Sequence, residues 1–352
     1  MSFDLSKLLR PHILTLAPYT SARDEYSGKL GIFLDANENP YGSITEQDFN
    51  RYPDPYQSDL KEKLSPIKQV PSDQIFLGNG SDEAIDLLFR AFCNPGKDNV
   101  ILLPPTYGMY GVSAAINQVE IRNVSLTEDF QLQPKLILEA ADQNTKIVFI
   151  CSPNNPSGNS MRLEDMELIL RNFPGLVVID EAYVDFMEQE SFAGRLDEFP
   201  NLLVIQTFSK AWGLASLRLG MAFGSKELIK VLNKIKPPYN ISGLTQDTVL
   251  EAMEKFPKVQ QMVQSILAER AQLRKDLNEI PQIERVYPSD ANFLLVKVPH
   301  ADQIYADLIA RRIILRNRSK VTLCENCLRI TVGTAEENQK FITELKAWFE
   351  KN

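Results

Sequence analysis

Between residue 75 and about residue 223, short apolar runs alternate with segments that have helical periodicity. Helical patterns at 81–92 and 106–116 each follow an apolar run, and further runs come after them. The runs that predict strands are "QIFLG", "NVILL", "VEIRNV", "KIVFIC", "GLVVID", "NLLVIQTF" and "LGMAFG". Strands this apolar, joined by helical crossovers, are typical of a mainly parallel sheet with both faces covered. We therefore predict an α/β fold whose ligands bind beyond the carboxyl ends of the strands.

The pattern changes at about residue 257. A long charged helical segment, 258–280, ends before Pro281 and is followed by strand and helix candidates of a smaller α+β domain. The strand candidates are 283–287, 292–298, 312–318 and 327–333, and the helix candidates are 302–311 and 335–350. We expect an N-terminal segment at 1–44 that packs with the small domain, a large ligand-binding domain at 45–256 and a small C-terminal domain at 257–352.

Composition and charge narrow the class of protein. Of 352 residues, 44% are hydrophobic and 24% are charged, which is ordinary for a soluble globular protein. The net charge of −8 argues against nucleic acid as a partner, because no basic tract is present to neutralise phosphates. No apolar stretch is long enough to span a bilayer, and no signal-peptide core is present. Cys324 and Cys327 lack a second pair or a nearby histidine, so we expect no metal site and a cytoplasmic protein.

Acid–base chemistry at neutral pH cannot come from a histidine cluster, because the chain has only His12 and His300. A tuned lysine is the natural candidate. Lys210 follows the apolar run 202–205 and lies among small residues in "TFSKAWGLASLRLG". It is either a strand-end lysine that extends to water, or a partly desolvated amine held for Schiff-base chemistry.

Polar groups also follow other predicted strands. Asp180 ends the run 175–180, where a buried carboxylate needs a cation, and Asn155 lies in the turn after 146–151. The stretch "GNGSDE" lies between a strand and a helix, where backbone N–H groups favour a phosphate. The residues concerned there are Gly80, Ser81 and Asp82.

Each of these groups has an ordinary alternative. Asp180 could cap a helix, Asn155 could form a turn, "GNGSDE" could be a helix N-cap, and Arg218 could make a surface ion pair. One ligand accounts for all of them together, namely pyridoxal 5′-phosphate, with its aldehyde, ring nitrogen and phosphate. A dinucleotide site is the weaker interpretation, because Glu83 stands where a third glycine is needed.

The segments "GNGSDE", "PPTYGMY", "CSPNNPSG", "IDEAYVDF", "TFSKAWGLASLRLG" and "CLRITVG" together resemble the fold-type I pyridoxal-phosphate aminotransferases. Within them the chain is most similar to the histidinol-phosphate aminotransferase family, in order from about residue 19 to residue 333. "SPNNPSG" and the segments around Asp180 and Lys210 mark the superfamily. "PPTYGMY" and "LRITVG" indicate the histidinol-phosphate branch.

The resemblance implies a role for each matching residue. Lys210 would form the Schiff base and shuttle a proton, Asp180 would pair with the pyridinium nitrogen, and Tyr107 would stack on the ring. The ring hydroxyl would be bound by Asn155 and Tyr183. The cofactor phosphate would lie against Gly80, Ser81, Asp82, Ser209 and Arg218, with Tyr52 reaching the neighbouring subunit of a homodimer.

The resemblance also implies the substrates. An amino group would pass from L-histidinol phosphate to 2-oxoglutarate, giving imidazole acetol phosphate and glutamate. Tyr19, Asn37, Arg316 and Arg329 would bind the substrates, and guanidinium groups suit both phosphate and carboxylate. Four alternatives stay open, which are an aromatic amino-acid aminotransferase, a threonine-phosphate decarboxylase of the same fold, a pyridoxal-phosphate-sensing regulator and a catalytically silent scaffold.

Overall fold

A seven-stranded sheet forms the centre of the protein, whose computed structural model describes residues 3–20 and 31–351. The sheet has the order β1-β7-β6-β5-β4-β2-β3. Strand pairs from β3 through β2, β4 and β5 to β6 are parallel, and β7 runs antiparallel to both β1 and β6. The strands are β1 (Ile75–Asn79), β2 (Asn99–Leu102), β3 (Glu120–Asn123), β4 (Thr145–Cys151), β5 (Leu176–Asp180), β6 (Leu202–Thr207) and β7 (Leu219–Gly224). The α/β prediction is confirmed.

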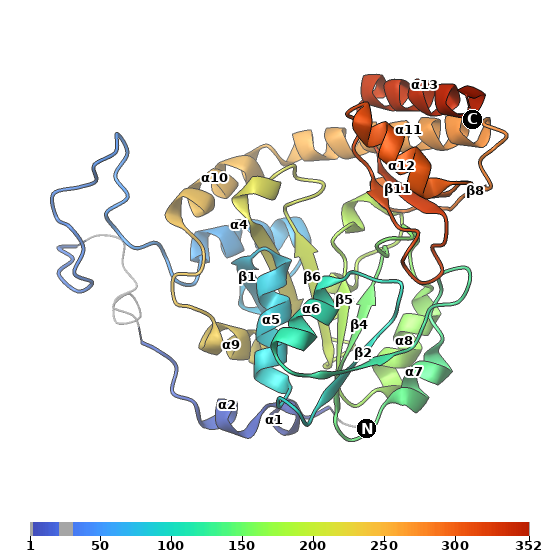
Figure 1. Ribbon diagram of the computed structural model, residues 1–352. Coiled ribbons are helices and arrows are strands. Elements are labelled where there is room, and N and C mark those ends of the chain that lie inside the picture. The colour runs from blue at the N-terminus through green and yellow to red at the C-terminus, as the bar shows by residue number, and fades with distance from the viewer. Residues whose placement is uncertain (1–2, 21–30, 352) are drawn as a thin grey trace.

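Helices cover both faces of this sheet (Figure 1). One face packs against α4 (Ser58–Lys68), α7 (Pro134–Ala140), α8 (Leu163–Asn172) and α10 (Gly243–Glu254). The other packs against α1 (Leu5–Leu8), α2 (Pro11–Thr15), α5 (Ser81–Phe92), α6 (Met109–Ile116) and α9 (Lys226–Ile235). Short 3-10 helices lie between strands, at η1 (Ser72–Gln74), η2 (Val184–Phe186), η3 (Phe192–Arg195) and η4 (Ala215–Leu217).

The continuous apolar runs of the sequence follow from this double cover. Along β4, Ile147 and Phe149 join the core beneath α5, while Val148 and Ile150 join the core beneath α8. Successive side chains of a strand point to opposite faces, so a strand that is covered on both sides must be apolar throughout. All four side chains are fully buried.

A second sheet carries the C-terminal part of the chain, in the order β10-β11-β9-β8. Its strands are β8 (Arg285–Val286), β9 (Phe293–Lys297), β10 (Arg316–Asn317) and β11 (Cys327–Thr331), and its helices are α11 (Phe256–Asn278), α12 (Ala301–Ala310) and α13 (Ala335–Lys351). On β9, Leu294 and Val296 pack under these helices, whereas Phe293 and Leu295 join the core of the large sheet. The second sheet therefore presents one face to the large domain.

The start of the chain differs from its prediction. We expected residues 1–44 to pack with the small domain, but α1 and α2 pack against the large sheet's helices. Leu8 and Ile13 belong to the core that contains Phe92, and the amide of Arg10 donates a 3.0 Å hydrogen bond to the carbonyl of Ala91. Apolar residues on two short helices carried no information about which core they would join.

The strand predicted at 312–318 is also much shorter than expected. Residue Arg312 has a positive φ of 63°, and the amide of Ile313 still bonds to the carbonyl of Leu308 at the end of α12. The turn that ends α12 therefore occupies the first half of the segment predicted as a strand. Only Arg316–Asn317 pair as β10.

The described residues include no membrane-spanning helix, no cluster of candidate metal ligands and no disulfide. None of their helices combines the length and apolar composition that crossing a membrane requires. They contain no group of three or more His, Cys, Asp or Glu side chains placed to hold a metal ion. The four cysteines are free and buried.

Candidate active site

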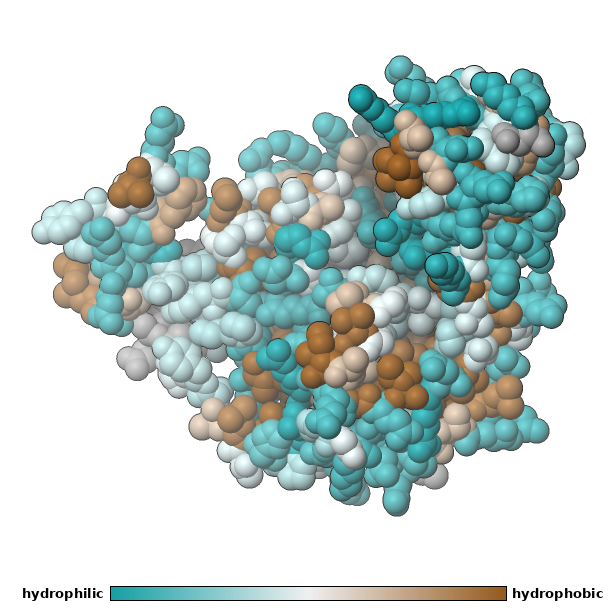
Figure 2. Space-filling view, in the orientation of Figure 1, coloured by the Kyte–Doolittle hydropathy of each residue, from teal (hydrophilic) through white to brown (hydrophobic). Residues whose placement is uncertain are grey.

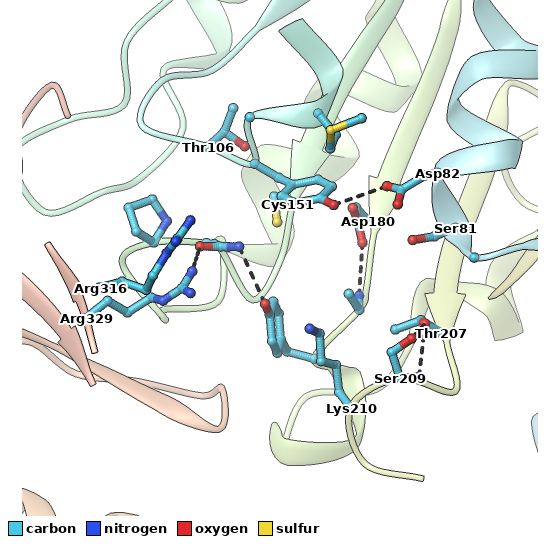
Figure 3. Close-up of a pocket in the computed structure, with 18 of the residues that line it drawn as sticks. Ser81, Asp82, Thr106, Cys151, Asp180, Thr207, Ser209, Lys210, Arg316 and Arg329 are labelled. Carbon is cyan, nitrogen blue, oxygen red and sulfur yellow. Dashed lines mark hydrogen bonds between the residues drawn. The ribbon is translucent and has the colours of Figure 1, made fainter. Parts of the chain in front are cut away.

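A cavity of about 620 Å³ opens at the carboxyl ends of β4, β5 and β6, where the second sheet faces the first. It collects all but three of the predicted site residues. Figure 3 shows Arg316 and Arg329 at one end of the cavity, Ser81 and Asp82 at the other, and Lys210 between them. The predicted residues that line it are Gly80, Ser81, Asp82, Tyr107, Asn155, Asp180, Tyr183, Ser209, Lys210, Arg218, Arg316 and Arg329.

Asp180 is the last residue of β5 and is only 3% exposed. One carboxylate oxygen accepts a 2.6 Å hydrogen bond from the hydroxyl of Tyr110, and the other accepts a 3.0 Å bond from the amide of Ala182. Burial raises the pKa of Asp180 to about 6, while these two donors act in the opposite direction. The site therefore holds a carboxylate that a nearby cation would stabilise as an anion.

Lys210 follows β6, and its side chain lines the cavity. Its Nζ lies 5.8 Å from the centroid of the Tyr183 ring. Partial desolvation lowers the pKa of Lys210, and repulsion from Arg329 adds to the effect. A lowered pKa increases the neutral, nucleophilic fraction of an amine at a given pH. The structure therefore supports the chemical interpretation of Lys210 over that of a surface lysine.

Asn155 and Tyr183 lie beside the lysine. The side-chain amide of Asn155 donates to the Tyr183 hydroxyl at 3.5 Å, and Arg329 donates to the amide oxygen of Asn155. Tyr183 is 7% exposed and meets the ring of Phe293 edge to face, with centroids 5.2 Å apart. This chain of contacts links the end of β4 to β11, and so joins the two sheets across the cavity.

The N-terminus of α5 forms the opposite end. Gly80 precedes it with a φ of +73°, and no side chain caps the first amides of the helix. A Cβ on Gly220 would lie 2.2 Å from the amide nitrogen of Ser81, so only glycine lets β7 approach this turn. Arg218 lies 3.7 Å from Asp82 in an ion pair that is partly open to solvent. Uncapped amides, a helix dipole and a guanidinium together favour an anion.

Two further side chains flank this anion site. The hydroxyl of Tyr107 donates to Asp82 at 3.1 Å, and Tyr107 lines the cavity beside the N-terminus of α5. The hydroxyl of Ser209 accepts a 3.0 Å hydrogen bond from Thr207 at the end of β6. Both residues are held by neighbours that themselves line the cavity.

Three predicted site residues do not reach this cavity within one chain. Tyr19 is 74% exposed and borders a separate small hollow beside Lys236. Asn37 is exposed, with a φ of 55°. Tyr52 is 51% exposed and stacks on Tyr239 with ring centroids 4.4 Å apart. Their roles stay predictions, and only that of Tyr52 was expected to involve a neighbouring subunit.

Two residues that the sequence analysis left out belong to the site. Tyr110 is fully buried and holds Asp180, although its own motif had drawn attention only to Tyr107. Arg318 also lines the cavity, and it had been given no role. The spacing of Arg316 and Arg318 was the available signal, since residues two apart on a strand share a face.

A model of the family described as aminotransferase class I and II matches residues 32–345. The chain belongs to this family. It is also 54% identical to the histidinol-phosphate aminotransferase of Cytophaga hutchinsonii over 348 residues, which cover 99% of this chain and 100% of that protein. The histidinol-phosphate aminotransferase of Flavobacterium johnsoniae is 53% identical over 348 residues, covering 98% and 99%.

The fold of this aminotransferase also matches a solved structure. The histidinol-phosphate aminotransferase of Sinorhizobium meliloti, in complex with pyridoxal 5′-phosphate, superposes with a TM-score of 0.80. The match covers 96% of this chain and 97% of that one at 20% sequence identity. The two-sheet architecture is thus that of a known aminotransferase.

Proposed function

We propose that this aminotransferase moves the amino group of L-histidinol phosphate to 2-oxoglutarate, with pyridoxal 5′-phosphate as cofactor. The products are imidazole acetol phosphate and glutamate, in histidine biosynthesis. The observation that carries the proposal is the likeness, at up to 54% identity over almost the whole length, to histidinol-phosphate aminotransferases. The cavity supports it, because one space holds an amine, a buried carboxylate, an anion cradle and a group of arginines.

The residues present fit the cofactor. Its aldehyde needs an amine, and Lys210 is the lysine that lines the cavity with a lowered pKa. Its pyridine nitrogen needs a carboxylate, and Asp180 has both oxygens aligned by donors. Its phosphate needs a cradle, which the uncapped turn at Gly80 and the guanidinium of Arg218 provide.

The remaining contacts follow from this placement. Ser81 and Asp82 would offer backbone amides to the cofactor phosphate, with the hydroxyl of Ser209 beside them. Asn155 and Tyr183 would bind the ring hydroxyl, because their polar atoms already face each other at 3.5 Å. Tyr107 would lie against the ring face. A stacked aromatic ring restricts the cofactor to one orientation.

The chain's own residues would move the proton. When bound, pyridoxal phosphate supplies an electrophilic aldehyde and a ring that accepts the electron pair left by the departing α-proton. The neutral Nζ of Lys210 would take the α-proton from the amino donor and would later donate that proton as the product forms. Asp180 would hold a proton on the ring nitrogen throughout. The low pKa of Lys210 favours its role, because only the neutral amine accepts a proton.

We further propose a homodimer. In Figure 1 the segment that contains residues 31–50 projects away from the body of the protein, and Figure 2 shows apolar side chains on it. Ile32, Leu34, Tyr41 and Ile44 are at least 87% exposed. Apolar surface of this extent is covered in stable proteins, and a second copy would cover it while bringing Tyr52 and Tyr19 to the neighbouring cavity.

The same proposal includes a domain boundary and a cellular location. The large and small domains would divide at 256/257, where α11 begins after α10. A cytoplasmic location is supported by the four unpaired cysteines, since thiols stay reduced in that compartment.

The half-reaction tests the proposal directly. The purified protein is loaded with pyridoxal phosphate, and its visible spectrum is measured before and after L-histidinol phosphate is added without an oxo acid. We expect the absorbance of the lysine-bound cofactor to disappear and to return with 2-oxoglutarate. Loss of the band with phenylalanine or tyrosine but not with L-histidinol phosphate would assign an aromatic aminotransferase instead.

A further inference from the structure

Two arginines of the small sheet, and a third that directly follows its strand β10, line the cavity together. Arg316 in β10 stands directly opposite Arg329 in β11 in an antiparallel pair. Arg318 follows two residues after Arg316, and residues two apart in an extended chain point to the same side. All three side chains line the cavity. The third one has been given no role so far.

This arrangement is electrostatically unfavourable without an anion. Like charges directly opposite each other destabilise a strand pair. Burial lowers the pKa of Arg318 and of Arg329, and the repulsion of a neighbouring arginine contributes in each case. The Nε atoms of both side chains are buried without a hydrogen-bond partner.

Other arginines of the protein show the contrast. Arg122 and Arg195 have carboxylate partners at 2.6 and 2.8 Å. Among the residues that the structure describes, no carboxylate lies within ion-pair distance of any member of the three-arginine cluster (Arg316, Arg318 and Arg329). Arg318 and Arg329 are partly buried, whereas Arg316 is exposed. Cations that face a cavity without a carboxylate partner favour an anionic ligand there.

The backbone holds Arg318 in a fixed position. Its amide donates to the carbonyl of Cys327 at 2.8 Å, and its carbonyl accepts from Val321 at 2.8 Å. The amide of Cys324 continues the series to Val321 at 2.9 Å, and that of Cys327 donates to Cys324 at 3.0 Å. Both cysteines are fully buried, so they anchor the connection between β10 and β11. A side chain presented from such a rigid connection loses less entropy on binding.

Charge selects the ligand class. A phosphate monoester carries about −1.5 to −2 charges near neutral pH, whereas a carboxylate carries one. Two guanidinium groups are sufficient for a carboxylate, and a third adds attraction that grows with the charge of the ligand. We propose that Arg318 is a specificity-determining residue, which binds the phosphate group of the amino donor beside Arg316. This inference rests on the proposed function, because it takes L-histidinol phosphate as the donor.

The test compares donors with and without a phosphate. The cofactor-loaded enzyme and its Arg318→Gln and Arg318→Lys variants are titrated with L-histidinol phosphate, L-histidinol and L-glutamate, and the half-saturating concentration is read from the visible spectrum. We expect Arg318→Gln to raise the value for L-histidinol phosphate by about ten- to a hundredfold, the range of a charge-assisted hydrogen bond. The value for L-histidinol should stay within about twofold, and Arg318→Lys should recover part of the loss.

Lys320→Gln is the matched control. It removes the same charge two residues away, from an exposed side chain that does not line the cavity. It should leave all three titrations unchanged. If Arg318→Gln weakens L-histidinol and its phosphate ester equally, or no more than Lys320→Gln does, Arg318 does not recognise phosphate and the inference is wrong.

Calorimetric titration of the cofactor-loaded protein with inorganic phosphate separates this inference from the proposed function. A wild-type enzyme that ignores L-histidinol phosphate would refute the function. Weaker binding of inorganic phosphate by Arg318→Gln than by Lys320→Gln would still support the arginine's role. Equal binding of phosphate by the two variants would overturn it, whatever the donor.

Discussion

Tyr110→Phe is the sharpest perturbation that the structure offers, because it removes one hydroxyl and keeps the ring. The ring is fully buried, stacks on Phe149 with centroids 4.8 Å apart and meets Tyr107 edge to face at 5.5 Å. Phenylalanine preserves both contacts. What disappears is the 2.6 Å hydrogen bond to Asp180.

The size of the effect follows from that bond. A hydrogen bond to a charged group contributes about 1.5–3 kcal/mol, and one pKa unit corresponds to 1.36 kcal/mol. Because the Tyr110 hydroxyl stabilises the charged carboxylate, its loss favours the neutral form and raises the pKa of Asp180. From about 6 in the cofactor-free protein, the pKa should rise by roughly one to two units. At pH 7 the carboxylate would change from mostly charged to half charged or less.

The consequence for turnover has a definite sign. A more basic Asp180 holds more of the proton that it shares with the bound cofactor ring, so the ring accepts electrons less well. The rate should fall about two- to tenfold at pH 7, because the charged fraction of Asp180 drops from about nine-tenths to between about a half and a tenth. The loss of rate as the pH decreases should begin roughly one to two units higher than in the wild type.

The assay is the pH dependence of the half-reaction rate with saturating L-histidinol phosphate. Tyr287→Phe is the control, since Tyr287 is also buried, at 8% exposure, but lies outside the cavity. Circular dichroism establishes that both variants are folded. If Tyr110→Phe is folded and its rate declines over the same acidic pH range as that of the wild type, Tyr110 does not set the charge of Asp180.

Three further predictions concern attachment, packing and assembly. Lys210→Ala should abolish transamination and the covalent cofactor adduct, which reduction with borohydride and peptide mass spectrometry detect on the wild-type chain. Gly220→Ala should destabilise the fold by about 1–3 kcal/mol and weaken cofactor binding, because its Cβ would meet Ser81 at 2.2 Å. Thermal unfolding measures this against Gly194→Ala, whose Cβ would meet nothing within 4 Å. Tyr52→Phe should weaken cofactor binding without changing the sedimentation of the proposed dimer, and a monomeric wild-type enzyme would contradict that assignment.

The sequence predicted the large sheet well for a physical reason. Its strands are covered on both faces, so each one is a compact apolar run, and the run 219–224 coincides with β7. Parallel strands end at one edge, which is why Asn155, Asp180 and Lys210 could be expected to lie together. The cavity gathers all three.

Contacts between distant elements were beyond the same reasoning. Tyr110 lies on a helix with an apolar surface, and nothing in the helical pattern indicates that its hydroxyl meets a strand end 70 residues away. The packing of α1 and α2 was mistaken because two short apolar helices fit many surfaces. Tyr19, Asn37 and Tyr52 were assigned by resemblance, and a single chain does not bring them to the cavity.

The connection between β6 and β7 carries residues proposed to hold the cofactor, but none of the three-arginine cluster. Lys210 and Arg218 both belong to it, and its ends are joined because Thr207 pairs with Gly220. On the proposed roles, the contacts to the two ends of the cofactor therefore stay at a fixed separation. The three-arginine cluster comes from another sheet with its own helical cover. Evolution can thus alter the accepted anion through a few positions on a two-strand edge and leave the amine chemistry intact, so descendants with new substrates should diverge there first.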